Sequence, residues 1–210
     1  MTETPAEMPT GRAAYDPDHL LRCPSPAGWL PVALADLDSL LIDHAACEQK
    51  AAVAAMSVLT KLPEDRVFVE TLSHLAQEEM QHFDLVHRLV LARGATLRPL
   101  VVDPYVRDLV AIVRKGRVET LMDRLLVAAL IEARSHERFR LLAAALGPGP
   151  ERDLYEALIP PEAGHAALFV ALAERVAPKA EVRVRLSQVA DHEAAVVSAL
   201  GEAPEARMHG

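Results

Sequence analysis

A glutamate and histidine pattern that occurs twice, with nearly the same spacing, most constrains what this chain can fold into. In each half of the sequence a lone glutamate precedes a Glu-x-x-His motif, by 31 residues in the first half and by 30 in the second. The residues are Glu48, Glu79 and His82 in the first half and Glu132, Glu162 and His165 in the second. Residues three apart on an α-helix lie on one face, so each Glu-x-x-His pair can point at one metal ion. The repeat therefore predicts four antiparallel helices that share one interior site.

The sequence around these motifs has the periodicity of helices. Leu34, Leu37 and Leu41 recur at steps of three and four residues, which is typical of an amphipathic helix. Proline, which breaks helix interiors, is absent from 105–147. We predict helices over 31–60, 64–93, 104–115, 117–146, 151–176 and 180–200. No segment shows the alternating pattern of a strand, so we predict an all-α protein.

The predicted architecture is a ferritin-like four-helix bundle with a long crossover and additional helices. The predicted divisions are an irregular N-terminal arm and lead-in over 1–30, the bundle over 31–200 and a flexible C-terminal tail over 201–210.

Four carboxylates and two imidazoles in one interior site are the ligand set of ferritin-like di-iron and di-manganese bundles. Carboxylates are hard ligands that can bridge two cations and balance their charge, and imidazole suits iron. Glu48 and Glu132 lie among apolar neighbours, where an uncompensated carboxylate is costly. This setting argues against four solvated helix faces with ordinary ion pairs. We predict that the six residues bind two metal ions, and the ligand set accepts either iron or manganese.

Two further histidines share a helix face with a predicted ligand. His44 lies four residues before Glu48, and His136 lies four residues after Glu132. Both are candidates for supporting the ligands through hydrogen bonds; the alternative is a buried histidine that bonds to a neighbouring backbone group or carboxylate. The carboxylates that we consider as partners of the ligand histidines are Asp43, Glu78 and Asp191.

The composition is that of a folded protein in a reducing compartment. Hydrophobic residues make up 51% of the 210 residues, which excludes an intrinsically disordered chain. The longest apolar run, 166–173, is far shorter than the ~18 residues of a membrane-spanning helix. The first residues show no apolar signal-peptide region, and the two cysteines are too few for a disulfide framework. We therefore expect a cytoplasmic protein with no membrane partner.

The charge is acidic overall but basic in one stretch. The formal net charge of −8 argues against a protein that coats nucleic acid. Residues 93–118, however, contain six basic residues against two acidic ones. The basic residues are Arg93, Arg98, Arg107, Arg114, Lys115 and Arg117. Such a patch can bind the phosphate backbone of an RNA stem; the alternative is a solvated helix with scattered arginines.

Four stretches around the ligands carry a resemblance to a known family. They are LLIDHAACEQKAA (40–52), LAQEEMQHF (75–83), LIEARSHERF (130–139) and EAGHAALF (162–169), and the lead-in RCPSPAGWL (22–30) adds to them. Over about 22–200 the chain resembles the bacterial tRNA 2-methylthio-N6-isopentenyladenosine hydroxylases, which are ferritin-like di-iron monooxygenases. Three positions depart from the family pattern. Pro161 stands where a serine is usual, Gly164 where an arginine is usual, and His136 where a cysteine is usual.

The resemblance implies a function and a set of partners. The chain would hydroxylate the isopentenyl side chain of a hypermodified adenosine beside the anticodon of a tRNA, using dioxygen and two electrons. The six residues of the repeat would hold two iron ions. The resemblance also implies binding of the anticodon stem-loop, an external electron donor of the ferredoxin type and a monomer or small oligomer.

Three other functions remain open at this point. The acidic balance and the altered motif at 161–165 are compatible with a ferritin-like di-iron oxygenase that acts on a small molecule. A metal-handling protein of the same fold is a second possibility. A metal-free bundle that serves as an interaction module is the third.

Overall fold

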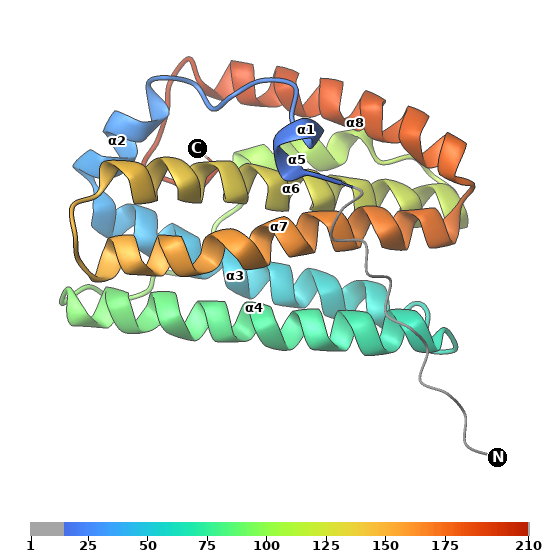
Figure 1. The fold of residues 1–210 in the computed structure, drawn as a ribbon, viewed down its shortest axis with the longest axis horizontal. Coiled ribbons are helices and arrows are strands. Elements are labelled where there is room, and N and C mark those ends of the chain that lie inside the picture. Colours follow the sequence, from blue (N-terminus) through green and yellow to red (C-terminus); the bar gives the residue numbers. More distant parts are fainter. Residues whose placement is uncertain (1–14, 210) are drawn as a thin grey trace.

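The computed structural model describes residues 15–209. Within this range the chain forms eight α-helices and no β-strand (Figure 1), which confirms the predicted all-α class. The four long helices of the bundle are α3 (Leu37–Leu59), α4 (Arg66–Ala92), α6 (Arg117–Ala145) and α7 (Pro150–Val176). In this described part of the chain, no helix is both long enough and apolar enough to cross a membrane.

The long helices pack as two hairpins, α3 with α4 and α6 with α7. Contacts between α4 and α7 join the two hairpins into one bundle. A long crossover links α4 to α6 and contains α5 (Pro104–Leu109) and the 3-10 helix η1 (Val110–Ile112). The last helix, α8 (Lys179–Leu200), packs on α5 and α6, on the side of the bundle away from α4 (Figure 1). This is the predicted ferritin-like bundle with its crossover and additional helices.

The entry to the first long helix differs from the prediction. The side chain of Asp36 accepts a hydrogen bond from the backbone N–H of Ser39 at 3.0 Å and so caps the start of α3. A separate helix, α2 (Trp29–Ala35), ends just before this cap. The prediction of one continuous helix over 31–60 is therefore wrong at Asp36, because the cap favours a break that apolar periodicity does not show.

The predicted N-terminal arm over 1–30 contains one short helix in its described part. This helix, α1 (Pro17–Leu20), packs on α6 and α7. The first fourteen residues of the arm lie outside the described part of the chain.

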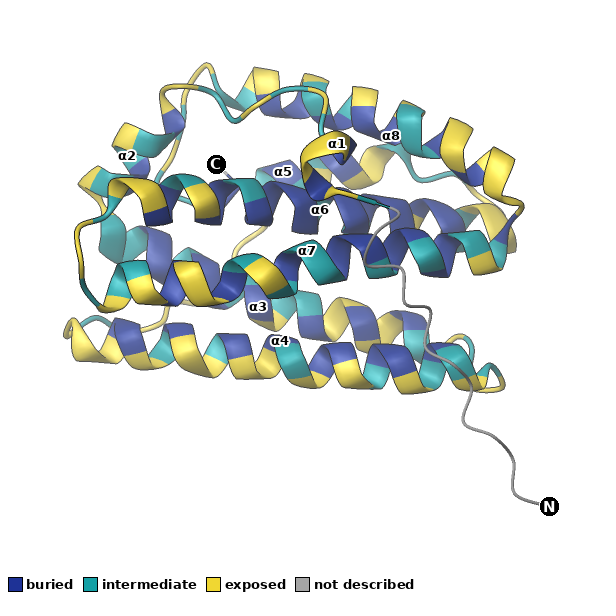
Figure 2. Cartoon of the chain, viewed as in Figure 1, coloured by how far each residue is buried: buried dark blue, intermediate teal, exposed yellow. Residues whose placement is uncertain are grey.

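Two apolar clusters fill the bundle, one on each side of the predicted ligand positions. On α3, Leu40 and Leu41 belong to one cluster and Ala55 and Val58 to the other, with Glu48 between them in the sequence. Figure 2 shows that the buried residues of the long helices gather on their inward faces. The polar side chains of the site thus form a layer that apolar packing shields at both ends.

The C-terminal segment enters the bundle. The sequence predicts a flexible tail over 201–210, whereas the structure places Met208 and His209 among the buried residues. The indole N–H of Trp29 donates to the carbonyl oxygen of Arg207 at 2.9 Å. Met208 belongs to the same apolar cluster as Trp29, so this short segment completes the core at one end of the bundle.

Candidate metal centre

The four long helices bring the six predicted ligands into one buried layer. α3 supplies Glu48, α4 supplies Glu79 and His82, α6 supplies Glu132, and α7 supplies Glu162 and His165. Each of the six is at most 7% exposed. Their donor atoms form two groups, Glu48, Glu79, His82 and Glu162 in one and Glu79, Glu132 and His165 in the other, and within each group these atoms lie within 4.8 Å of one another.

Glu79 belongs to both groups because its two oxygens face different histidines. Its Oε2 lies 3.5 Å from Nδ1 of His82, and its Oε1 lies 3.0 Å from Nδ1 of His165. The carboxylates of Glu48 and Glu162 also approach Nδ1 of His82, at 3.7 and 3.8 Å. This arrangement suits two adjacent metal ions, with one histidine at each ion and Glu79 between them.

Several of the candidate metal-ligand atoms in the layer lack a hydrogen-bond partner. They are Nδ1 of His82, Nδ1 of His165, Oε1 of Glu79 and Oε1 of Glu162. The contacts among them do not have hydrogen-bond geometry, although all four atoms are shielded from solvent. Buried polar atoms without a partner destabilise a fold. Metal cations would supply the missing partners, so the residues fit a dinuclear centre.

The charge balance of the layer supports the same interpretation. Burial and the charge of Glu79 raise the pKa of Glu132 to about 7, and burial and the charge of Glu132 raise the pKa of Glu162 well above its usual value. Burial alone would lower the pKa of His82 and His165, but the nearby carboxylates outweigh it and raise the two pKa values to about 10 and about 9. Without cations, protons must therefore offset the carboxylate charge.

His44 supports the first ligand directly. Its Nε2 lies 2.6 Å from Oε1 of Glu48, and both side chains are buried. Burial alone would raise the pKa of Glu48, but the contacts with His44 and His82 hold that pKa well below its usual range. The His44 ring stacks on Tyr155 with 5.6 Å between centroids and lies 4.9 Å from the Phe139 ring. Packing thus fixes the ring that orients Glu48.

Glu78 is the carboxylate that approaches a ligand histidine from outside the layer. Its Oε2 lies 3.3 Å from Nε2 of His165, which leaves Nδ1 of that ring facing the site. Ligand histidines commonly donate a hydrogen bond from their second ring nitrogen to such a carboxylate.

Tyr155 is a supporting residue that sequence reasoning missed. It lies seven residues before Glu162, a two-turn spacing on one helix face, and this spacing could have identified it.

The other candidate supporting residues lie elsewhere. Nδ1 of His136 is 3.7 Å from Asp18 of α1. Asp43 accepts the backbone N–H of Met208 at 2.8 Å. Asp191 is exposed and pairs with an arginine of the lead-in. The described contacts of these three residues include none with a ligand of the layer.

The structure separates the predicted RNA-binding residues into two groups. Arg93 forms ion pairs with Asp38 and Glu151, and Arg98 lies 3.4 Å from the hydroxyl oxygen of Ser39. Both therefore lie beside the start of α3, and Arg93 links three helices.

The second group comes from α5, from the connection that precedes α6 and from the first residue of α6. Its members are Arg107, Arg114, Lys115 and Arg117. Arg114 pairs with the buried carboxylate of Asp123 at 2.8 Å, which gives it a structural role. Arg117 lies 3.7 Å from Glu64, beyond the end of α3. Since α3 has 23 residues, Arg93 and Arg117 lie about 30 Å apart at its two ends, and the six residues do not form one compact patch.

An apolar cavity of about 400 Å³ lies one helical turn from the ligand layer. Ala128 and Phe169 line it; Ala128 lies four residues before Glu132, and Phe169 lies four residues after His165. This spacing places each lining residue on the same helix face as a ligand. The crossover and α6 contribute Val106, Val110, Val113 and Arg124 to the lining. The cavity can accept an apolar group beside the centre.

Gly164, which departs from the resembled pattern, borders open space. No atom lies within 4 Å of the position that its Cβ would occupy. With Pro160 and Tyr15 it lines a cavity of about 520 Å³. A larger side chain would fit here, so glycine at this position leaves the surface more open.

Comparison with known proteins agrees with the fold and the site. A protein of Pseudomonas putida named tRNA 2-(methylsulfanyl)-N(6)-isopentenyladenosine(37) hydroxylase is 40% identical over 168 residues, which cover 79% of this chain and 80% of that protein. A Salmonella typhimurium protein of the same name is 28% identical over 220 residues, with 80% of each chain covered.

A solved structure is also similar. It is titled "Protein 43 with aldehyde deformylating oxygenase activity from Synechococcus", is 40% identical, and superposes with a TM-score of 0.84 over 91% of this chain and 96% of that one. The model of the family described as tRNA-(MS[2]IO[6]A)-hydroxylase (MiaE) matches residues 14–210. The chain, with its buried layer of four glutamates and two histidines, therefore belongs to this tRNA hydroxylase family.

Proposed function

We propose that this chain is a tRNA-modifying, non-haem di-iron monooxygenase. Its substrate is 2-methylthio-N6-isopentenyladenosine next to the anticodon, and it hydroxylates the isopentenyl side chain with dioxygen and two electrons. An external donor, of the ferredoxin type, supplies the electrons. The observation that carries the proposal is the buried layer of six ligands in a chain that belongs to the tRNA hydroxylase family.

The six predicted ligands form two sets, one for each metal ion. Glu48, His82 and Glu162 would hold one iron and Glu132 and His165 the other, and Glu79 belongs to both groups of ligand atoms. When bound, the di-iron centre supplies the activation of dioxygen and the oxidation of a C–H bond. The protein supplies orientation, since His44 fixes Glu48, and it excludes water, since apolar clusters lie on both sides of the layer.

The apolar cavity beside the layer suits the isopentenyl chain. Its volume of about 400 Å³ exceeds the needs of a five-carbon chain, and Ala55, Ala128 and Phe169 offer it no hydrogen-bonding group. Because Ala128 and Phe169 each lie one turn from a ligand, a chain in this cavity would end near the metal ions. The rest of the nucleotide would be splayed out of the anticodon loop at the cavity mouth.

Exposed cations lie where the phosphates of such a substrate would be. Arg124 lines the cavity and is exposed. Arg117 is the first residue of α6 and Lys115 lies just before it, and both are exposed. Arg107 is on α5 next to the lining residue Val106. These four residues define what we call the cavity rim. We propose that the cavity rim holds the backbone of the anticodon stem-loop.

Analysis of modified nucleosides tests the function. In a strain that lacks the gene, the hydroxylated adenosine should be absent from tRNA and its unhydroxylated precursor should accumulate. The wild-type gene should restore it, and Glu79→Ala should not. Glu70→Ala is the matched control, because Glu70 is an exposed glutamate of the same helix. A hydroxylated nucleoside that persists without the gene would overturn the tRNA assignment.

A second function is favoured by one observation. The Synechococcus protein, whose title names aldehyde deformylating oxygenase activity, is as similar to this chain as the Pseudomonas protein. The same iron-loaded preparation should therefore be given tRNA carrying the precursor nucleoside and, separately, a long-chain aldehyde. Turnover of tRNA alone supports the proposed function. Turnover of the aldehyde alone would move the assignment to a small-molecule oxygenase.

A further inference from the structure

We propose that a second, mononuclear metal site lies beside the dinuclear centre, formed by Cys47, Asp103 and His209. The three residues come from α3, from the residue before α5 and from the C-terminal segment. None of them belongs to the six-ligand layer. The site would bind a zinc-type cation. This proposal does not depend on the identity of the substrate.

The donor atoms are already spaced for one cation. Nδ1 of His209 lies 3.8 Å from Sγ of Cys47 and 3.5 Å from Oδ2 of Asp103, and all three atoms lie within 4.8 Å of one another. In a tetrahedral zinc site with bonds of about 2.0–2.3 Å, ligand atoms are about 3.3–3.7 Å apart. Only small movements would be needed to close the three atoms around an ion.

The remaining atom of each oxygen or nitrogen ligand is held by another group. Nε2 of His209 lies 3.2 Å from the hydroxyl of Ser135, and the ring stacks on Tyr105 with 4.9 Å between centroids. Oδ1 of Asp103 accepts the backbone N–H of Val106 at 3.3 Å. These contacts leave Nδ1 and Oδ2 facing the thiol. Such outer contacts are what orients the ligands of protein metal sites.

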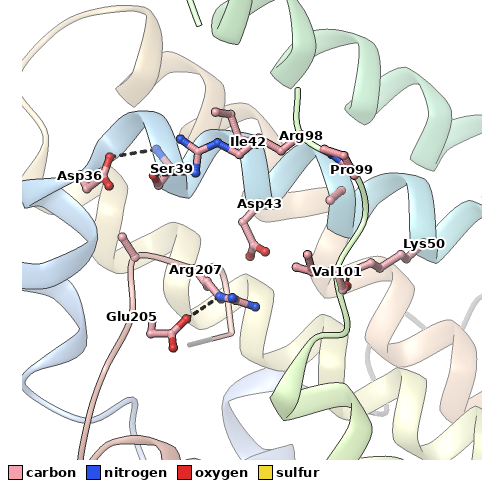
Figure 3. Close-up of a pocket in the computed structure, with 12 residues that line it drawn as sticks. Asp36, Ser39, Ile42, Asp43, Lys50, Arg98, Pro99, Val101, Glu205 and Arg207 are labelled. Atoms are coloured by element: carbon pink, nitrogen blue, oxygen red, sulfur yellow. Dashed lines mark hydrogen bonds and ion pairs between the residues drawn. The ribbon is translucent and has the colours of Figure 1, made fainter. Parts of the chain in front are cut away.

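A cavity that is open to solvent approaches the site through Asp43. A polar cavity of about 350 Å³, shown in Figure 3, is lined by Asp43, Lys50 and Arg207. Asp43 points into this cavity, and its Oδ2 lies 3.9 Å from Sγ of Cys47. Asp43 thus joins the cavity to the cluster, although none of the three proposed ligands lines the cavity itself.

The donor set determines the class of cation. One sulfur, one imidazole nitrogen and one carboxylate oxygen suit zinc, whereas calcium and magnesium prefer oxygen ligands only. A bound ion would tie the C-terminal segment to α3 and to the crossover. The competing interpretation is that the three side chains form a metal-free, hydrogen-bonded contact with the same structural effect.

Cobalt(II) titration of the full-length protein distinguishes the two interpretations. Cobalt(II) bound by a cysteine gives a thiolate-to-metal charge-transfer absorption in the near ultraviolet, and the dinuclear layer has no sulfur ligand. We expect this band in the wild type at one equivalent per chain, with zinc displacing it. We expect it to persist in Glu132→Ala, which damages only the dinuclear layer. Absence of the band in folded wild-type protein would overturn the proposal without any variant of the site.

Variants then assign the ligands. Cys47→Ser and Asp103→Asn should each abolish the band and lower zinc content by one ion per chain, while iron content stays the same. Asp103→Asn keeps an oxygen to cap α5, so it tests ligation with little cost to the fold. Cys23→Ser is the matched control, because Cys23 is the other free, half-buried cysteine. A band that survives Cys47→Ser but disappears in Cys23→Ser would also refute the assignment.

Discussion

His44 binds no metal in the proposed site, yet the geometry of Glu48 depends on it. Its Nε2 lies 2.6 Å from Oε1 of that ligand in a buried pair. We expect His44→Ala to weaken iron binding about 10- to 100-fold, the usual effect of removing such a partner. Iron per chain, measured after dialysis against a weak chelator, checks this.

His136 provides the matched control for that experiment. It is a buried histidine at the same four-residue spacing from a ligand, but its described contact is with Asp18. His136→Ala should therefore retain iron. Equal loss of iron in the two variants would show that the His44 contact has no special role and that both changes act through packing.

The pKa values of the ligands predict that metal uptake depends on pH. The raised pKa values of His82 (about 10) and His165 (about 9) mean that both imidazoles carry protons at neutral pH in the metal-free protein, and that of Glu132 (about 7) means that this carboxyl is partly protonated. Metal ions bind the deprotonated forms, so uptake must release protons, and affinity must fall as pH falls. Calorimetric titration with iron(II) in two buffers of different ionisation enthalpy measures this release. Uptake without proton release, at an affinity unchanged between about pH 6 and 8, would contradict the charge balance described above.

At the residue scale, the sequence predicted which residues gather but not which neighbours support them. The six ligands follow from spacing alone, because a helix places residues three and four apart on one face. His44 and His136 have the same spacing from a ligand, yet only His44 bonds to one. The difference lies in the docking of α1, which brings Asp18 to His136, and no local pattern encodes that contact.

At the element scale, the long helices were predictable and the short connections were less so. Apolar periodicity over two dozen residues fixes a long helix within a few residues of its ends. The break at Asp36 depends on one cap, and the burial of the C-terminal segment depends on a groove that exists only after α2, α3 and α6 have packed. Neither feature leaves a periodic trace in the sequence.

The C-terminal segment is expected to stabilise the bundle measurably. Met208 is fully buried in the cluster that contains Trp29, so Met208→Ala should lower the free energy of unfolding by about 2–4 kcal/mol. Met56→Ala, at a site 45% exposed, should change it by less than about 0.5 kcal/mol. Urea unfolding followed by circular dichroism gives both values. A Met208→Ala variant as stable as the wild type would mean that the segment contributes little to the core.

At the scale of the whole molecule, the net charge of −8 hides an uneven distribution. Four of the acidic residues are the buried glutamates of the layer, where bound cations would offset them. Several arginines of the basic stretch are also occupied, since Arg93 and Arg114 hold structural ion pairs. In the proposed function, the charge that an RNA meets is therefore neither the sum over the chain nor the sum over 93–118, but that of the exposed side chains around the apolar cavity.

This distribution predicts where tRNA binding is sensitive to mutation. Reversing Lys115 or Arg124 to glutamate should weaken binding of tRNA and make it less dependent on salt, with the slope of log affinity against log salt reduced by about 1 for each phosphate that the variant no longer neutralises. Arg152→Glu, a reversal at a half-buried position near the start of α7, carries the same change in net charge. Filter binding at several salt concentrations separates the two cases. If the three reversals weaken binding equally, the tRNA responds to total charge, and the cavity rim is not its docking site. If only the reversals in the cavity rim weaken binding, the apolar cavity and the phosphate contacts belong to one substrate-binding surface.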